Sequence, residues 1–366
     1  MDLASVVRVS GARTTFPVST PLTISVDAMG GDNAPNMAIE AINLNLARHP
    51  GVRFLLFGRE RQLTPLLEQY ANVKSVAEIR DTIDVVGSGE KPSVALRTGR
   101  QSSMRRAIDA VGAGEADAVV SAGNTGALMA MAKFVLKTLP GVDRPAIATV
   151  FPTRRGRTVM LDLGANVECD ENNLVQFAIM GEVFSRKVLG LERPTVGILN
   201  IGEEDLKGNV AVKKAAAILQ ESNLSFHFNG FVEGTDIGSG TVDVIVTDGF
   251  TGNVALKTVE GTSKLFSYYL KTALTSSPMA RMGALLAGPA LRKLRKNVDP
   301  RQHDGAMFLG LNGVCVKSHG GTDALGFSNA VHVAVELVRD RVNEGIKKDF
   351  AKLNADFAVN SKVATG

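Results

Sequence analysis

The chain has 366 residues, of which 45% are hydrophobic and 21% charged, with 37 glycines, no tryptophan and a net charge of +4 at pH 7. This length and composition predict an α/β protein of about two domains with a large core, and they exclude a disordered or fibrous chain. No stretch reaches the roughly eighteen uncharged apolar residues that a membrane-spanning helix needs. Cys169 and Cys315 are far apart and have no partner at metal-ligand spacing, so we expect neither a disulfide framework nor a zinc site, and a reducing cytoplasm fits.

Strands and helices alternate along most of the chain. Residues 1–21 are expected to form a loose extension. Apolar runs predict strands at 22–28, 52–57, 117–120, 146–151, 158–163, 195–200, 225–231, 242–247 and 307–317, and helices are predicted at 33–48, after Gly58, and at 123–137, 172–189, 254–274 and 323–344. Because strands separated by helices form a largely parallel sheet, we expect a single α/β catalytic unit over 22–345, with helices on both faces and about two lobes around a cleft. The tail, 346–366, is expected to be peripheral.

Five short loops of similar composition follow apolar runs. They lie at 27–32, 121–126, 200–204, 247–253 and 318–323, and we number them 1 to 5. In an open α/β sheet such loops gather at the carboxyl ends of strands, where ligands bind. Glycine lets a backbone approach closely, and the free N–H groups that start the next helix favour an anion. The five loops therefore predict one polar, anion-binding cleft.

Loop 2, with the sequence Ser121-Ala122-Gly123-Asn124-Thr125-Gly126, is the clearest candidate for a phosphate site. Its backbone amides open a predicted helix, and Asn124 and Thr125 could add side-chain donors. An ordinary helix cap is the alternative. The chain has no G-x-x-x-x-G-K-[ST] motif and no G-x-G-x-x-G after the first strand, which argues against a nucleotide.

Three further side chains suit anion or thioester chemistry. Lys207 and Lys257 follow loops 3 and 4 and could neutralise an oxyanion, although each could equally be a surface lysine. His319 is the one histidine of five that lies in a loop of this type, and it could donate a hydrogen bond to developing charge; a structural role is the alternative. The sequence offers no compact set of metal ligands, so we expect no metal and no cofactor.

A basic segment interrupts the alternation of strands and helices. Seven basic residues between Lys271 and Arg301 stand against one acidic residue, Asp299. Helix-start and Gly-Pro signals predict two short helices over 276–300, amphipathic and basic. This surface could bind a dimer partner or an anionic membrane, and packing within the protein is the alternative. The residues expected on it are Met282, Leu285, Leu286, Leu291, Arg292, Lys293, Leu294, Arg295 and Lys296.

Five ordered motifs carry a resemblance to a known family. They are Ser25–Pro35, loop 2, Leu161–Asn166, Asn200–Gly202 with Lys207–Asn209, and Thr247–Lys257. Together they resemble the phosphate acyltransferase family of bacterial phospholipid synthesis, from about Leu22 to about Val342. The chain departs from the family in residues 1–21 and in loop 5, where Ser318, Gly321 and Thr322 stand in place of an alanine and two serines.

The resemblance implies a fold like that of phosphotransacetylases and of the isocitrate/isopropylmalate dehydrogenases. It implies an enzyme that converts an acyl-acyl-carrier protein and inorganic phosphate into an acyl phosphate, without a cofactor and without a nucleic-acid partner. It also implies a cytoplasmic homodimer, peripherally associated with the inner face of the cell membrane, that passes its product to a membrane glycerol-3-phosphate acyltransferase.

The expected site residues come from the loops. We expect catalytic roles for Asn124, His319, Lys207 and Lys257. The expected substrate-binding residues are Asp27, Gly30, Gly31, Asp32, Gly123, Thr125, Gly126, Asn166, Asn200, Gly202, Glu203, Asn209, Asp248, Gly249, Thr251, Gly252, Asn253, Gly320 and Asp323.

Three other functions stay open at the level of sequence. A phosphotransacetylase-like enzyme would use acyl-coenzyme A in place of the carrier protein. A metal-dependent hydroxyacid dehydrogenase on the related fold would need a compact acidic cluster, which the sequence does not reveal. A regulatory protein that binds carrier or membrane would consume no acyl thioester.

Overall fold

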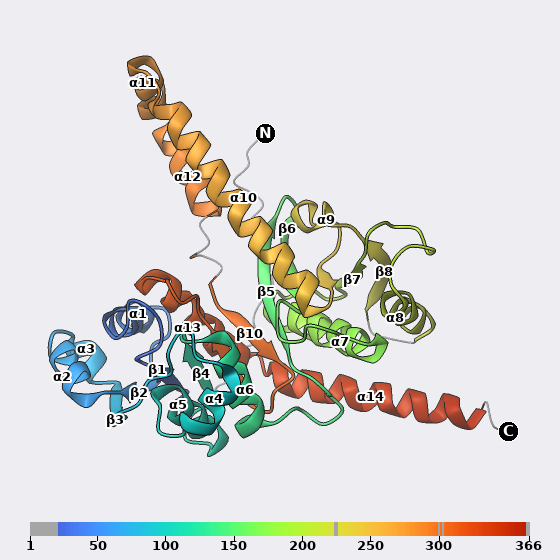
Figure 1. Ribbon diagram of the computed structural model, residues 1–366, viewed down its shortest axis with the longest axis horizontal. Coiled ribbons are helices and arrows are strands. Elements are labelled where there is room, and N and C mark those ends of the chain that lie inside the picture. The colour runs from blue at the N-terminus through green and yellow to red at the C-terminus, as the bar shows by residue number, and fades with distance from the viewer. Residues whose placement is uncertain (1–20, 223–225, 299–300, 302–303, 364–366) are drawn as a thin grey trace.

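The structure is a computed structural model that describes residues 21–222, 226–298, 301 and 304–363 (Figure 1). The predicted extension, 1–21, lies almost wholly outside the described residues, as do the side chains of Arg295 and Lys296.

Three stretches of chain supply the elements. The first contains β1 (Thr23–Asp27), α1 (Asn36–Leu46), β2 (Arg53–Gly58), α2 (Glu60–Glu68), α3 (Ala71–Lys74), β3 (Ala77–Asp81), α4 (Pro92–Thr98), α5 (Ser103–Gly112), β4 (Ala118–Ser121) and α6 (Thr125–Leu136). The second contains β5 (Ala146–Thr153), β6 (Gly156–Leu161), α7 (Glu171–Val188), β7 (Thr195–Leu199), α8 (Val210–Glu221), β8 (His227–Val232), α9 (Asp236–Ser239), β9 (Val244–Val246) and α10 (Gly249–Thr275). The third contains α11 (Pro278–Leu286), α12 (Gly288–Val298), β10 (Ala306–Leu309), β11 (Val314–Lys317), α13 (Ala324–Arg339) and α14 (Val342–Val363).

The described strands form one eleven-stranded sheet in the order β3-β2-β1-β4-β11-β10-β5-β6-β9-β7-β8. Most neighbours are parallel, but β10 is antiparallel to both β11 and β5, and β5 is antiparallel to β6. The strands β3, β2, β1, β4 and β11 therefore run one way, and β6, β9, β7 and β8 run the other way. We call these two groups of strands, with their helices, the first half and the second half.

The strand ends of both halves meet at one row of residues across the sheet. The register aligns Val26, Val120, Val316, Met307, Ala148, Leu161, Val246 and Ile198. Strands of the first half end just past this row on one side, and β6, β9 and β7 end just past it on the other side. The loops that follow the strands of the two halves therefore begin at this one row and leave it in opposite directions.

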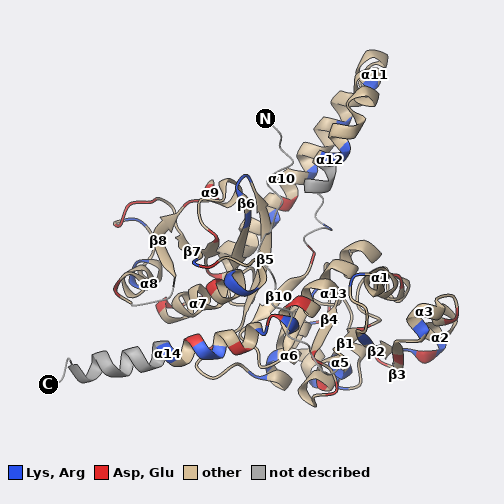
Figure 2. Cartoon of the chain, turned by 180° about the vertical axis from the view of Figure 1, so that it is seen from behind, with Lys and Arg blue, Asp and Glu red and all other residues tan. Residues whose placement is uncertain are grey.

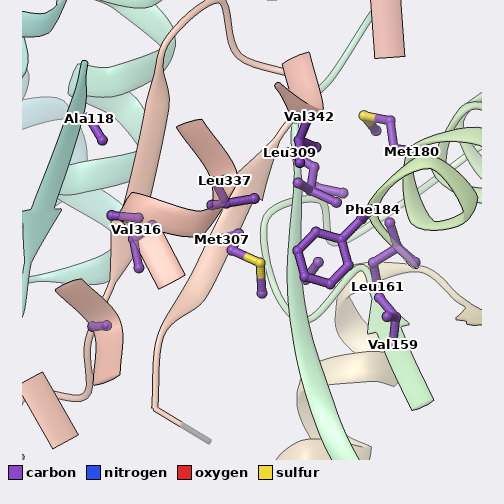
Figure 3. Close-up of a cluster of buried hydrophobic side chains, with 14 of the residues drawn as sticks. Ala118, Val159, Leu161, Met180, Phe184, Met307, Leu309, Val316, Leu337 and Val342 are labelled. Carbon is purple, nitrogen blue, oxygen red and sulfur yellow. The ribbon is translucent and has the colours of Figure 1, made fainter. Parts of the chain in front are cut away.

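Alternating side chains build a hydrophobic core on each face of the sheet. On β2, Phe54 and Leu56 pack into one core and Leu55 and Phe57 into the other, as the two-residue period of a strand requires. Figure 3 shows the place where the halves join, with Met307 directed toward the same space as Phe184 of α7. The predicted α/β class, with a mostly parallel sheet covered on both faces, is confirmed.

The segment from α10 to α12 projects from the body as a helical hairpin (Figure 1). The α10 helix has 27 residues, of which only Gly249 and Gly252 are buried. On α11, Leu285 and Leu286 are about four-fifths exposed, at 80% and 81%. The predicted pair of short helices is present as α11 and α12, and apart from Gly249 and Gly252 at the base of α10 the described residues of the hairpin are exposed or only partly buried. No helix of the described chain is both long and apolar enough to cross a bilayer.

The C-terminal segment differs from the prediction in two ways. The expected helix over 323–344 ends at Arg339, and a new helix starts after Arg341, whose φ is 51°. The tail is not simply peripheral, because Ile346 and Phe350 are buried and Asp349 accepts a hydrogen bond of 2.6 Å from Arg186 of α7. The apolar residues 342, 346 and 350 recur every four positions, which places them on one face of α14.

Candidate active site

Loops 1, 2 and 5 lie together at the edge of the first half. The amide of Asp32 donates to the carbonyl of Gly320 at 2.8 Å, which joins loop 1 to loop 5. The Ser121 hydroxyl donates to Asp27 at 2.7 Å, and the Ser318 amide donates to the Ser121 carbonyl at 2.9 Å. Three loops from separate parts of the sequence therefore form one continuous surface, which we call the first loop group.

Loops 3 and 4 lie with residues 162–166 at the strand ends of the second half, and we call them the second loop group. The Gly249 amide donates to the Asn166 carbonyl at 2.7 Å, and loop 3 follows β7, the neighbour of β9. The strand ends of both groups lie along the same row of the sheet, and the expectation of one cleft that gathers all five loops stays a prediction. The strands β6, β9 and β7 run opposite to those of the first half, which hydrophobic periodicity does not reveal.

One side chain of the second half approaches the first loop group. Lys257, on α10, is close enough to Lys317 of β11 for its positive charge to disfavour the charged form of Lys317. Lys257 is 57% exposed and pairs with Glu260 at 3.0 Å. Of the two lysines proposed for charge stabilisation, Lys257 is the one whose charge reaches the first loop group. Lys207 is exposed in loop 3 and pairs with Glu204 at 3.5 Å.

Loop 2 offers unpaired backbone donors. Among the described residues, the amides of Asn124, Thr125 and Gly126 have no hydrogen-bond acceptor, and they open α6. Such amides, at the positive end of a helix dipole, form a ready anion site. Phosphate binding at loop 2 stays a prediction.

The Asn124 side chain does not have the predicted role of a free donor to substrate. Its Oδ1 accepts from the Ala127 amide at 3.0 Å, which caps α6. Its Nδ2 donates to the carbonyls of Ser88 and Glu90 at 2.8 and 2.9 Å. With these bonds made, Asn124 positions loop 2 against residues 87–90, and Thr125 is the exposed hydroxyl of the loop.

Close backbone packing explains the glycines of loop 1. A Cβ on Gly30 would lie 2.5 Å from the Asp27 carboxylate and 2.8 Å from the Gly123 amide nitrogen. Gly31 has a φ of 99°, which L side chains rarely adopt. Loop 1 thus supports loop 2 from beneath, a role that the sequence did not specify.

Asp27 is a buried carboxyl at the centre of the first loop group. Burial raises its pKa, while the nearby hydroxyls of Ser103 and Ser121 and the nearby amides of Met29 and Gly30 partly oppose that rise. A carboxyl in this position holds the ends of β1 and β4 together and is not exposed to substrate.

Lys317 is the residue of this group that sequence reasoning missed. Its side chain is buried, and its Nζ donates to the carbonyls of Ala122 in loop 2, at 3.4 Å, and of Ser318 in loop 5. Burial lowers the pKa of Lys317 to about 8, against the opposing effect of Asp304 and Asp27. The available signal was a lysine at the last position of an apolar strand, directly before a glycine-rich loop.

His319 is exposed, and its orientation is fixed by the backbone. The Gly321 amide donates to His319 Nδ1 at 3.2 Å, so in the neutral imidazole the proton resides on Nε2. Beneath it, Asp304 accepts from the His319 amide at 3.0 Å and from the hydroxyls of Ser318 and Thr322 at 2.9 and 2.6 Å. His319 therefore presents an N–H donor to solvent from a well-anchored loop.

Several expected binding residues cap helices. Asp323 accepts from the Gly326 amide at 3.1 Å and pairs with Arg301 at 2.7 Å. Asn209 caps α8, and Asp248 caps α10 and also accepts from the Thr251 hydroxyl at 2.8 Å.

The second loop group is held by a buried carboxylate. Asp162 accepts from the amides of Gly164, Ala165 and Asn166. Burial raises the pKa of Asp162, and these hydrogen bonds oppose that rise. The other members of the second loop group occupy ordinary loop positions. Asn200 donates to the Lys207 carbonyl, and Gly202 is buried. Glu203, Gly164 and Asn253 are exposed.

The described residues contain one cluster of possible metal ligands, made of His49, His332 and Glu336, away from the loops. Arg339 donates to His49 Nδ1 at 2.9 Å, which places the proton of neutral His49 on Nε2. That nitrogen lies 2.8 Å from His332 Nδ1 and donates to it. The lone pairs that a metal would need are thus used in a hydrogen-bonded chain between α13 and the turn after α1.

The fold defines the class of protein. A phosphotransacetylase from Streptococcus pyogenes superposes with a TM-score of 0.59, covering 88% of this chain and 94% of that chain at 16% identity, which shows a shared fold. The family model described as fatty acid synthesis protein matches residues 22–345. Phosphate acyltransferases from Rhodospirillum rubrum and Rhodospirillum centenum are 61% and 60% identical to this chain. Each match covers 92% of this chain, and the two matches cover 96% and 95% of those proteins. The chain belongs to the phosphate acyltransferase family, as its motifs indicated, and is an acyltransferase.

Proposed function

We propose that this enzyme transfers the acyl group of an acyl-acyl-carrier protein to inorganic phosphate, in an early step of phosphatidic acid synthesis. The observation that carries the proposal is the row of unpaired amides at Asn124, Thr125 and Gly126, in the same loop group as the His319 donor. These groups can hold a phosphate and stabilise a thioester carbonyl without a metal or cofactor.

The chemistry needs positioning more than activation. A phosphate oxygen attacks the thioester carbonyl carbon and forms a C–O bond, and the C–S bond then breaks to release the carrier's thiolate. Phosphate is a competent nucleophile near neutral pH and a thiolate is a good leaving group, so orientation and oxyanion stabilisation can supply the rate. No covalent intermediate with the enzyme is required.

The polar groups divide these tasks. The loop 2 amides and the Thr125 hydroxyl bind phosphate, with Asn124 and Lys317 as positioning residues. The Nε2–H of His319 donates to the carbonyl oxygen or to the leaving sulfur. Lys257 offsets the negative charge of the transition state, because its charge already acts on the first loop group. The second loop group and Lys207 supply further substrate-binding groups from the second half of the sheet.

We further propose a cytoplasmic homodimer that attaches to the inner face of the cell membrane and delivers acyl phosphate to a membrane glycerol-3-phosphate acyltransferase. On α10, Leu265, Phe266, Tyr268 and Tyr269 are all more than half exposed, and a second copy of the chain would cover them. At the hairpin tip, apolar side chains lie near basic ones, which suits an anionic lipid surface.

The activity is tested by mixing the enzyme, phosphate and an acyl-carrier protein and measuring acyl phosphate. We expect phosphate-dependent product, with His319→Ala at least tenfold slower and folded normally by circular dichroism. Product from acyl-coenzyme A alone would instead favour a phosphotransacetylase-like enzyme. Consumption of neither donor would reject the proposal, and a normal rate for His319→Ala would remove His319 from the mechanism.

Membrane attachment is tested by vesicle flotation. The variant Leu285→Gln, Leu286→Gln, Leu291→Gln should lose binding to anionic vesicles and keep its activity in solution. A control with Leu44→Gln and Leu206→Gln changes exposed leucines on the body, at 45% and 91% exposure, and should bind normally. Undiminished binding by the hairpin variant would show that another surface meets the membrane.

A further inference from the structure

The turn between β5 and β6 concentrates positive charge that the proposed chemistry does not use. Arg154, Arg155 and Arg157 flank Gly156, and all three are exposed. Within the described parts of the chain, none of them lies within ion-pair distance of an acidic side chain. In Figure 2 the ribbon at this turn, near α9, has the blue of Lys and Arg. We call these residues the arginine turn.

The arginine turn stands above the edge that carries the first loop group. Strand β5 runs in the same direction as β11, with β10 between them, and Ala148 is level with Val316. From Ala148 the strand continues five residues to Thr153, which carries the turn about 16 Å beyond the row of strand ends at ~3.3 Å per residue. Since β5 lies two strand spacings, about 10 Å, from β11, the turn is roughly 20 Å from loop 5.

The backbone of the turn is held in place, while its three arginines make no ion pair within the described residues. Thr153 pairs with Gly156 in the antiparallel ladder, and the Arg154 amide donates to the Gly238 carbonyl at 3.1 Å, which ties the turn to the end of α9. The nearby carboxylate of Asp236 accepts from the Glu233 amide at 2.8 Å and makes no ion pair with the turn in the described chain. The backbone positions of the three arginines are therefore set before a partner binds.

We propose that the arginine turn is the docking surface for an acidic face of the protein that carries the acyl thioester. This inference rests on the proposed function, because it concerns the donor of that reaction. Three guanidiniums with no acidic partner among the described residues suit carboxylates on a protein surface. Their position lets a bound carrier extend its thioester arm about 20 Å to loops 2 and 5. The electrostatic attraction raises the rate at which the carrier protein associates with the enzyme, and it weakens as the salt concentration rises.

The test compares two triple variants of the full-length enzyme. One carries Arg154→Gln, Arg155→Gln and Arg157→Gln; its matched control carries Arg61→Gln, Lys347→Gln and Lys348→Gln, which removes three exposed charges elsewhere. The arginine-turn variant should bind an unacylated bacterial acyl carrier protein at least tenfold more weakly by fluorescence anisotropy. The KM for acyl-carrier protein should rise by a similar factor, the salt dependence should flatten, and kcat at saturation should stay the same.

Each outcome decides between separate explanations. Unchanged carrier binding by the variant would overturn the docking proposal, and so would a variant that loses vesicle binding while it keeps carrier binding. An equal loss in the control would show a general charge effect and would also overturn it. If the wild type binds the carrier through the turn but forms no acyl phosphate, the proposed function fails and the docking surface stands.

Discussion

Lys317 allows a direct thermodynamic test of the buried charge beneath the first loop group. In the folded enzyme burial lowers its pKa to about 8, whereas an unburied lysine has a pKa of 10.5. The unfolded chain therefore binds more protons than the folded chain between these two pH values, so the free energy of unfolding rises with pH across that window. At ~1.4 kcal/mol per pKa unit, this rise amounts to about 3 kcal/mol.

The variant Lys317→Met keeps an unbranched side chain and removes the titrating group. Loss of the ammonium leaves the carbonyls of Ala122 and Ser318 without a donor, at about 1–3 kcal/mol each, and this cost does not depend on pH. The stability of the wild type minus that of the variant should thus grow by about 3 kcal/mol from about pH 8 to pH 10.5. Urea unfolding followed by circular dichroism at four pH values measures this difference.

A matched control is Lys74→Met, which removes an exposed lysine from α3. Its stability should follow the wild type at every pH, because other groups that titrate in alkali are shared and cancel. If the curve for Lys317→Met also runs parallel to the wild type, Lys317 is not a buried ammonium and the reasoning is refuted.

Three other perturbations address the same loops and the histidine pair. Asn124→Ala should destabilise the enzyme by about 1–2 kcal/mol in urea unfolding, because the helix cap is lost. It should also slow the formation of acyl phosphate at least tenfold, and an unchanged rate would show that loop 2 takes no part in the reaction. Burial raises the pKa of Asp27, so its contribution to stability falls as pH rises above about 4, and Asp27→Asn should remove that fall in a series of unfolding curves. Burial, followed by the charges of His332 and Arg339, lowers the pKa of His49 from 6.5 to about 4. Below pH 6.5 the unfolded state therefore binds more protons than the folded state. Acidification from pH 7 to 5 should lower the free energy of unfolding of the wild type by ~2 kcal/mol more than that of His49→Gln. Equal losses of stability in urea unfolding would contradict this prediction.

Local signals in the sequence were sufficient for the class of fold. Apolar runs located most strands, and the loop 2 motif located the start of α6 because capping chemistry is encoded within a few residues. The protruding hairpin was equally predictable from Ser276-Ser277-Pro278 and Gly288-Pro289, which mark where its helices start and stop.

Features set by long-range pairing were not predictable. The direction of a strand decides on which side its following loop leaves the sheet. The apolar runs of β6, β9 and β7 do not encode that direction. Asn124 was assigned to substrate because its partners, Ser88 and Glu90, lie more than thirty positions away along the chain. In the sequence Lys317 looks like the polar end of a strand, but in the fold backbone carbonyls surround its ammonium group. Phe350 looks like a residue of a loose tail, but in the fold α7 covers it.

The order of the strands in the sheet also dictates when the enzyme can assemble during translation. Strands β5 to β9 are contiguous in sequence, so the second half can form as soon as it has left the ribosome. The first half cannot, because β10 and β11 join β4 to β5 and are made from residues 306–317. Until those residues emerge, β4 and β5 present unpaired edges and loops 1 and 2 lack loop 5. We therefore expect a nascent chain that stops short of residue 306 to expose both strand edges and to aggregate readily.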